Sequence, residues 1–182
     1  MRRLIKDPLF SDPSVSNSGI EVYKEEIMKI LFHRGRMLLL DHVTISSAKA
    51  VGRFTVPAEN CEGHEPMPGL LVMRGVEICE MGFQLLGIVL AKNHNPELFG
   101  LLRDKAFAAR EITGAKFNGF VTPGKQITLE VAPDIYIDDV ADTLKIDMSG
   151  FIAKIDGRKS AAISSLSIVA FDPSKISSRS HS

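Results

Sequence analysis

His64 lies in the turn Gly-His-Glu-Pro-Met-Pro-Gly, directly before an apolar segment that carries Arg74, Glu77 and Glu80. A histidine between glycine and proline has a restricted backbone, and its ring can act as a general acid or base near neutral pH. A carboxylate in a mostly apolar cleft can take part in the same proton transfer. The spacing fits a hydrogen-bonded loop histidine equally well, so both interpretations stand at this point.

Arg74 and Glu77 are three residues apart, so on a helix their side chains share a face and can form an ion pair. Such a pair would be structural, whereas the functional interpretation makes one of the carboxylates a partner for His64. The segment opens with a Pro-Gly pair that is typical of a helix N-terminus, where free N–H groups and the helix dipole favour negative charge. The N–H groups of Gly69 and Leu70 would stabilise a carbonyl oxygen that gains charge there.

The elements that must position these residues follow from the hydrophobic pattern. Residues 20–32 place apolar side chains at helical spacing and predict a short amphipathic helix, and residues 36–45 and 50–56 have the pattern of strands. Residues 69–92 predict a long helix that ends before the Asn-His-Asn-Pro run at 93–96. This helix is apolar on most of its surface, so we expect it to be buried against a sheet.

The rest of the chain has the pattern of β-strands, at residues 105–111, 115–121, 126–137, 142–155 and 159–171. Apolar positions change parity at Gly150, which predicts a β-bulge, and Asp156-Gly157 predicts a hairpin turn. Strands, one buried helix and a run of antiparallel strands indicate an α+β fold with a single curved sheet around the helix. A second copy of the chain is the natural cover for the apolar sheet surface that remains.

The length of 182 residues suits one domain. We expect residues 1–19 to form a surface arm, residues 20–172 the domain, and residues 173–182 a disordered polar tail.

Composition excludes several classes of function. Lys plus Arg and Asp plus Glu are 22 each, so the formal charge is zero, which argues against nucleic acid as the main partner. The two cysteines, Cys61 and Cys79, form no metal-ligand pattern and indicate reduced cytosolic thiols. The charges within residues 69–92 argue against a membrane span, and the N-terminus lacks the pattern of a signal peptide. We therefore expect a cytoplasmic protein without a metal.

Three segments together resemble the hotdog-fold 3-hydroxyacyl-acyl-carrier-protein dehydratases of type II fatty acid synthesis. "FHRGRMLLLDHV" at 32–43 is similar to the family's His-Arg, apolar run and Asp signature. "EGHEPMPGLLVM" at 62–73 resembles its Gly-His turn followed by Met-Pro-Gly and the central helix. "AKFNGFVTPGKQITLEV" at 115–131 resembles its Lys-Phe, Val-x-Pro-Gly and Gln-x-x-Leu-Glu-Val strand pair. The three segments occur in the family's order.

The resemblance implies a hotdog fold, with a long central helix wrapped by an antiparallel sheet, in a homodimer or trimer of dimers. It implies a site at the dimer interface, with a histidine from one subunit and a carboxylate from the central helix of the other. The acyl group would be carried on the phosphopantetheine of acyl-carrier protein or on coenzyme A, with no further cofactor. The histidine would move the C2 proton, the carboxylate would help the C3 hydroxyl leave, and backbone N–H groups would polarise the thioester.

The sequence departs from this pattern in two places. Only Glu65 and Pro66 separate His64 from Met67, a shorter turn than the family has. Counting forward from Met67, the position of the family's carboxylate holds Arg74, and arginine cannot act as an acid at ordinary pH. Either the carboxylate has moved one helical turn to Glu77, or the dehydratase site has been lost.

The first hypothesis is therefore a dehydratase, or in reverse a hydratase, of 3-hydroxyacyl thioesters. It assigns His64 and Glu77 as catalytic residues and the Gly69 and Leu70 backbone to the thioester carbonyl. The alternative is a non-catalytic hotdog subunit or acyl-thioester sensor in which Arg74 binds an anion or a partner subunit. A thioesterase on the same fold is the weaker third candidate.

Overall fold

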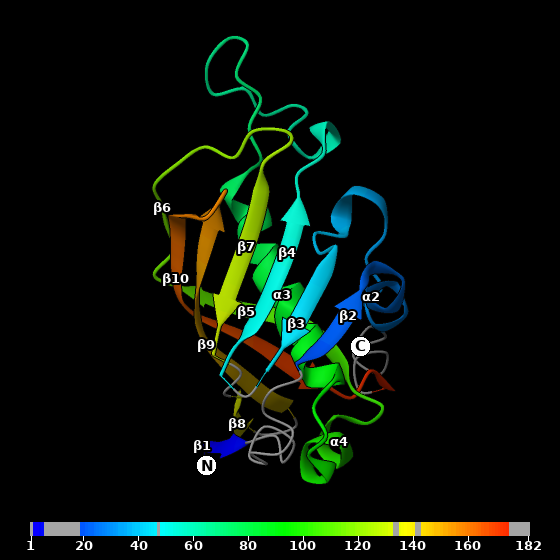
Figure 1. Ribbon diagram of the computed structural model, residues 1–182. Coiled ribbons are helices and arrows are strands. Elements are labelled where there is room, and N and C mark those ends of the chain that lie inside the picture. The colour runs from blue at the N-terminus through cyan, green and yellow to red at the C-terminus, as the bar shows by residue number, and fades with distance from the viewer. Residues whose placement is uncertain (1, 6–18, 47, 133–134, 141–142, 175–182) are drawn as a thin grey trace.

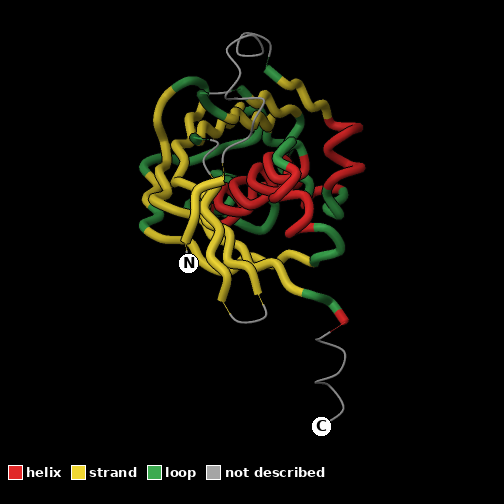
Figure 2. Tube along the Cα trace, turned by 90° about the horizontal axis from the view of Figure 1, so that it is seen from below, coloured by secondary structure: helices red, strands yellow, loops and turns green. Residues whose placement is uncertain are grey.

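A single antiparallel sheet wraps around one long helix in the computed structural model, which describes residues 2–5, 19–46, 48–132, 135–140 and 143–174 (Figures 1 and 2). Residues 1 and 6–18 of the expected surface arm (1–19) and residues 175–182 of the expected tail (173–182) lie outside the described residues. The helices and strands are β1 (Arg2–Ile5), β2 (Ile20–Tyr23), α2 (Lys24–Ile30), β3 (His42–Ile45), β4 (Ala50–Thr55), α3 (Gly75–Ala91), α4 (Pro96–Leu102), β5 (Ala106–Thr113), β6 (Lys116–Phe117), β7 (Gln126–Val131), β8 (Ile135–Val140), β9 (Thr143–Ile155) and β10 (Arg158–Phe171).

The described strands are joined in the order β1-β8-β9-β7-β4-β3-β2, and β10 pairs with β9 and carries β5 and β6 on its other edge. β9 is long enough to pair with β8 through its first half and with β7 through its second half. This arrangement curls the sheet around α3, as the view along the helix in Figure 2 shows. The predicted α+β class with a central helix is confirmed.

The core lies between α3 and the concave face of the sheet. α3 contacts α2, β3, β4, β9 and β10, and residues on most of its circumference are buried, as its apolar surface predicted. Gly82 is the point of closest approach, because a Cβ there would lie 2.3 Å from the ring of Phe151 and 2.7 Å from Leu166. A larger residue at Gly82 would push the helix off the sheet.

The N-terminal boundary of α3 differs from the prediction. The helix begins at Gly75, with Arg74 as its N-cap residue, and not at residue 69. The Pro68-Gly69 pair lies instead in a tight turn, where Met67 and Leu70 form a β-bridge. A proline and a glycine are typical of both a helix start and a turn, so their presence alone could not decide between the two.

Two predictions in the first part of the chain are wrong in detail. The segment expected as one helix over residues 20–32 starts as β2, because Ile20 and Val22 pair with Ile45 and Val43 of β3, and only α2 is helical. The segment expected as a strand over residues 36–45 becomes β3 only in its last residues. Its apolar run before β3 is buried without belonging to a strand.

The parity change at Gly150 is present, but the predicted β-bulge is not. The β9–β10 register runs without a shift across this point, and its irregularity lies between Lys159 and Ala161. Both strands change their buried face together, because the backbones cross so closely that a Cβ on Gly150 would lie 1.9 Å from the carbonyl oxygen of Ile163. The glycine therefore marks a bend shared by two strands. The predicted turn at Asp156-Gly157 is confirmed, with φ of 46° and 81°.

α4 and β1 were not predicted. Asn95 caps α4 by accepting hydrogen bonds from the N–H groups of Glu97 and Leu98, and Pro96 occupies the first turn. The Asn-Pro-Glu sequence therefore carried a helix-start signal. β1 pairs with β8, close to α4 at the lower end of the molecule in Figure 1.

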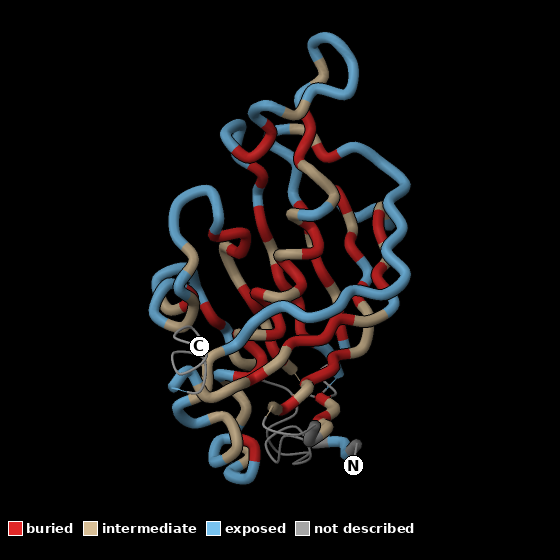
Figure 3. The backbone as a smooth tube through the Cα atoms, turned by 180° about the vertical axis from the view of Figure 1, so that it is seen from behind, coloured by how far each residue is buried: buried red, intermediate tan, exposed pale blue. Residues whose placement is uncertain are grey.

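β5 has one neighbour in the described sheet, β10, and its other edge is open. Its side chains are exposed along nearly the whole strand, and an exposed run crosses the molecule in the back view of Figure 3. Phe107 and Ile112 of β5 are large apolar residues on this surface, and Phe117 and Phe120 follow close by. An open apolar edge of this kind is where a second chain can add its own strand.

Both cysteines are buried free thiols, as expected. None of the described helices is sufficiently long and apolar to cross a bilayer.

Candidate active site

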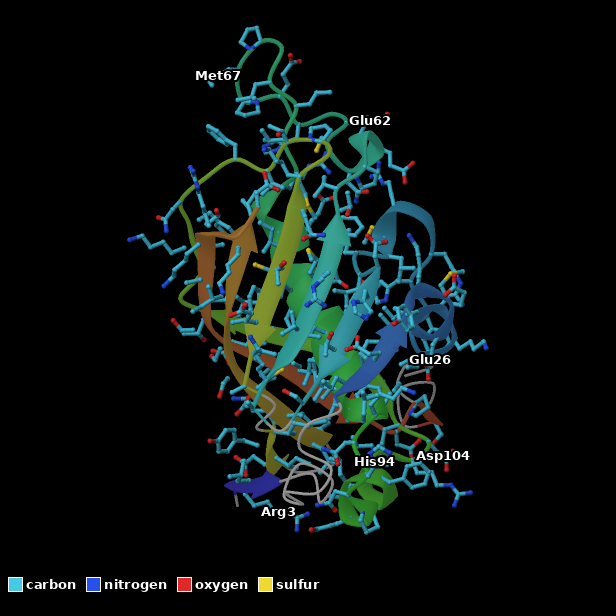
Figure 4. All side chains as sticks on the ribbon, viewed as in Figure 1. Arg3, Glu26, Glu62, Met67, His94 and Asp104 are labelled. Carbon is cyan, nitrogen blue, oxygen red and sulfur yellow. The ribbon has the colours of Figure 1, made fainter. Side chains whose placement is uncertain are left out.

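Residues 65–71 form a loop at the upper end of the molecule in Figure 1, and backbone pairing with Val72 places His64 at its base. The N–H of Val72 donates to the carbonyl oxygen of His64 at 3.1 Å, and this hydrogen bond joins the two ends of the loop formed by residues 65–71. Met67 lies at the outer part of this loop, away from the sheet (Figure 4). Beyond the loop, the N–H of Met73 donates to the carbonyl oxygen of Val121 at 2.8 Å, which fixes the chain just before α3.

The ring of His64 is oriented by its own loop. Its Nδ1 lies 3.0 Å from the carbonyl oxygen of Val72. A carbonyl oxygen only accepts hydrogen bonds, so Nδ1 carries the proton and Nε2 of the neutral ring carries a lone pair. Because the residue is half-buried, Nε2 can accept a proton from a bound substrate.

Gly69 and Leu70 do not lie at the start of the helix, so that part of the prediction is wrong. The N–H of Gly69 donates to the carboxylate of Glu65, and the N–H of Leu70 donates to the carbonyl oxygen of Met67 at 2.9 Å. The first N–H groups of the helix belong to Gly75 and Val76, which have no acceptor among the described residues.

Glu77 caps the helix that it belongs to. Its Oε2 accepts a hydrogen bond from the backbone N–H of Arg74 at 3.0 Å, in the manner of the carboxylate in a capping box. The guanidinium of Arg74 lies beside Gly63, where a Cβ would be 3.7 Å from Nη2. Burial, and to a smaller extent the charge of Glu77, raise the pKa of the Cys61 thiol.

Glu80 lies on the wall of an apolar cavity of about 670 Å³. The cavity runs between α3, the segment that follows α2, α4 and β5. Its lining includes His33, Glu80, Phe83, Gln84, Leu98 and Phe107. An elongated apolar cavity with a small number of polar groups is the usual form of a site for an apolar ligand.

Two side chains contact one oxygen of the Glu80 carboxylate, Gln84 through a hydrogen bond and His33 as an ion-pair contact. Nε2 of Gln84 lies 3.2 Å from Oε1, and Nε2 of His33 lies 3.1 Å from the same oxygen. Gln84 is itself 1% exposed, accepts from the N–H of Leu39 at 2.9 Å and donates to the carbonyl oxygen of Met37 at 2.7 Å. The other oxygen, Oε2, has no hydrogen-bond partner within the described part of the chain.

His64 and Glu80 do not meet within one chain, because His64 is absent from the lining of the cavity that contains Glu80. The cavity wall does include Ala106 to Ala109 of β5, whose outer edge is open. A second chain that pairs along β5 would therefore cover the cavity and bring its own residues to it.

From the sequence, Glu80 is a carboxylate that could act with His64, but the first hypothesis assigns that role to Glu77. The spacing carried the signal for Glu80: Met67 and Arg74 are seven residues apart, and the same count from Met73 ends at Glu80. The observed helix begins at Gly75, directly after Met73 and Arg74, so Met73 is the residue from which to count. Across the described residues, no three His, Cys, Asp or Glu side chains are grouped as metal ligands.

Comparison with known proteins identifies the family to which the chain is similar. The FabA-like domain profile matches residues 31–161. The 3-hydroxyacyl-[acyl-carrier-protein] dehydratase FabZ of Thiobacillus denitrificans is 36% identical over 113 residues, which are 58% of this chain and 72% of that protein. FabZ of Ligilactobacillus salivarius is 36% identical over 138 residues, 74% of this chain and 89% of that protein. The solved dehydratase heterocomplex ApeI:P from Xenorhabdus doucetiae shares the fold, with a TM-score of 0.58 and 14% identity over 86% of this chain and 97% of that one.

Proposed function

Since the chain belongs to the FabA-like domain family and is homologous to the FabZ dehydratases, we propose that it catalyses the reversible dehydration of 3-hydroxyacyl thioesters to trans-2-enoyl thioesters. The observation that carries this proposal is the apolar cavity with Glu80 on its wall, one carboxylate oxygen held and the other open. The acyl group would enter on the phosphopantetheine of acyl-carrier protein or on coenzyme A.

The proposed reaction needs one base and one acid. Nε2 of His64 takes the proton from C2, and the electrons of that C–H bond form the C2–C3 double bond. The C3–O bond breaks, and the hydroxyl leaves as water with a proton from Oε2 of Glu80. Transfer of the proton from His64 back to Glu80, directly or through water, restores both residues, so the proton balance closes without a cofactor. Hydration follows the same steps in reverse.

The thioester oxygen gains negative charge when C2 loses its proton. The N–H groups of Gly75 and Val76 at the start of α3 are the proposed donors to this oxygen, in place of those of Gly69 and Leu70. They lie at the positive end of the dipole of a long helix, which favours an anion.

The catalytic pair is proposed to form between two subunits of a homodimer. The separation of His64 from the cavity of its own chain and the open edge of β5 at that cavity both support this arrangement. Pairing of β5 with the same strand of a second copy would cover Phe107 and Ile112 and extend the sheet. His64 of one subunit would then face the partner subunit's Glu80.

Arg74 no longer argues for a lost site. That argument placed Arg74 at the carboxylate position of the helix, whereas Arg74 is the N-cap residue outside it. Relative to the family's Met-Pro-Gly, the departure becomes an arginine in place of proline, at a position that takes no part in the proposed chemistry. The non-catalytic subunit and the thioesterase therefore have no observation that favours them over the dehydratase.

Turnover on crotonyl thioesters tests the proposal. Wild type and His64→Ala should be given crotonyl coenzyme A and crotonyl acyl-carrier protein, and loss of the conjugated enoyl absorbance followed. The proposal expects wild-type hydration of at least one of the two thioesters and a fall in kcat of about 10² to 10⁴-fold for His64→Ala. A folded wild-type dimer that hydrates neither thioester would contradict it.

A further inference from the structure

His33 follows α2 in the sequence Leu-Phe-His-Arg, and its backbone is fixed by the arginine beside it. Nη1 of Arg34 donates to the carbonyl oxygen of Leu31 at 2.6 Å and to that of His33 at 2.7 Å. Phe32 and His33 both line the cavity, and Phe32 is 99% exposed at its edge. The imidazole of His33 reaches the carboxylate of Glu80 on the cavity wall.

Inside the cavity the imidazole of His33 contacts the carboxylate of Glu80. Nε2 of His33 lies 3.1 Å from Oε1 of Glu80, and the two side chains are 36% and 28% exposed. Gln84 donates to the same oxygen from one turn further along the helix. The hydrogen bond from Gln84 and the contact with His33 therefore converge on Oε1, and a rotation of the carboxylate would lose both.

The close contact at Oε1 bears on where protons lie. A carboxylate has no proton to share, so a favourable contact with it requires hydrogen on Nε2 of His33, and Nδ1 is buried without a partner among the described residues. With Oε1 occupied as an acceptor, a protonated Glu80 carries its hydrogen on Oε2. Oε2 is the oxygen that has no partner in the described chain. The proton is thus presented at the free side of the carboxyl group.

We propose that His33 is a positioning residue that holds Oε1 of Glu80 and so directs the Oε2 proton toward the C3 hydroxyl of the substrate. This role rests on the proposed function, because it assigns His33 to the proton-donating half of the same reaction. His33 touches Glu80 and does not touch the reacting atoms. Without the imidazole of His33, only Gln84 holds the carboxyl group of Glu80. This carboxyl group then points its Oε2 proton at the C3 hydroxyl for a smaller fraction of the time.

The chain contains a matched control, a second histidine–glutamate pair. His42 of β3 contacts the carboxylate of Glu21 of β2, stacks on Tyr23 with ring centroids 4.8 Å apart and lies 3.2 Å from Nη1 of Arg53. None of these residues lines the cavity. If loss of any histidine–glutamate pair lowers activity, substitution of His33 and of His42 should both lower kcat. If His33 positions Glu80 for catalysis, only its substitution should lower kcat.

The kinetic test compares wild type, His33→Leu, His33→Gln and His42→Leu in hydration of the same crotonyl thioesters. We expect His33→Leu to lower kcat about 10- to 100-fold with KM within about three-fold, because an orienting partner of a catalytic group is lost and substrate contacts are kept. The amide N–H of His33→Gln can reach Oε1, so it should restore kcat to within about five-fold of wild type. His42→Leu should leave both constants unchanged. Equal loss in the leucine and glutamine variants, or no loss in either, would overturn the proposal.

A second measurement separates this proposal from the proposed function. Long-range ¹H–¹⁵N correlation spectra of the imidazoles should show His33 protonated on Nε2, with a resonance that moves in Glu80→Gln and stays in place in Glu77→Gln. If the ring nitrogen resonances of His33 do not move in either variant, His33 does not contact Glu80 and the proposal is wrong. Absence of wild-type turnover would instead defeat the proposed function, and the spectrum would still decide whether His33 holds Glu80.

Discussion

Glu77 and Glu80 lie three residues apart on α3, and their surroundings differ in almost every respect. The carboxylate of Glu77 turns back to the helix start and accepts from the N–H of Arg74. The carboxylate of Glu80 faces a cavity, where His33 and Gln84 contact one oxygen and the other oxygen has no partner among the described residues. The carboxylate of Glu77 caps the N-terminus of α3, and the carboxylate of Glu80 can contact a ligand in the cavity.

The difference between them comes from where the helix begins. A carboxylate at the third position of a helix can reach back to the N-cap N–H, and one that is three residues further along cannot. Because α3 starts at Gly75, Glu77 occupies the capping position and Glu80 lies beyond it. Had the helix begun at residue 69, both would lie deep in the helix and neither would cap it.

The largest expected effect separates the two carboxylates by catalysis. Glu80→Gln should lower kcat by about 10² to 10⁴-fold, because the amide cannot donate the acid proton, while Glu77→Gln should stay within about three-fold of wild type. Steady-state hydration of crotonyl thioesters measures both. A larger loss in Glu77→Gln than in Glu80→Gln would return the catalytic role to Glu77.

The next effect concerns the support of Glu80. Gln84→Met should lower the free energy of unfolding by about 1 to 3 kcal/mol, because the N–H of Leu39 and the carbonyl oxygen of Met37 lose a buried partner. Urea denaturation measures the change, with Gln126→Met on the exposed start of β7 as the control. Equal stability of the two variants would mean that Gln84 does not join α3 to the segment before β3.

A smaller effect is expected at the helix cap. Glu77→Gln should lower the free energy of unfolding by about 0.5 to 1 kcal/mol near neutral pH, because a neutral amide is a weaker acceptor and loses the interaction with the helix dipole. The same denaturation experiment measures it. A stability equal to that of wild type would show that the contact with the Arg74 N–H contributes nothing.

The smallest effect joins Glu77 to Cys61. Burial, and then the carboxylate of Glu77, raise the pKa of this thiol above its ordinary value of 9.0. A thiol pKa that is higher in the folded than in the unfolded protein stabilises the fold below the unfolded pKa, and the contribution is lost as pH rises through the folded pKa. Glu77→Gln removes the smaller part of this pKa shift, so the deficit in unfolding free energy of the variant relative to wild type should narrow as pH rises above 9.0. The pKa of Cys79 is raised by burial alone, so Cys79→Ala should not alter this narrowing.

Much of the fold could be predicted from the sequence. The strands β4, β7, β9 and β10, the Asp156-Gly157 turn and the buried central helix follow from local patterns that no distant contact overrides. The N-terminal half of the first expected helix could not be predicted, because pairing of Ile20 and Val22 with β3 decides its structure.

The candidate site was only half predictable for the same kind of reason. His64 is recognisable because its turn lies in one short segment. The identity of the catalytic carboxylate, Glu77 or Glu80, depends on whether Pro68-Gly69 begins a helix or lies in a loop. The hydrogen bonds of Val72 with His64 and of Met73 with Val121 place this pair in a loop. The last of these joins residues far apart in sequence, so the local pattern could not reveal it.

The most direct measurement is complementation between two inactive chains. His64→Ala and Glu80→Gln should be coexpressed with different affinity tags, and the mixed dimer isolated through both tags. A site shared between subunits leaves one intact pair in each mixed dimer, so about half of the wild-type activity per dimer is expected. A pure mixed dimer as inactive as its two parents would show that His64 and Glu80 do not act across the interface, and would contradict the catalytic pair proposed for this chain.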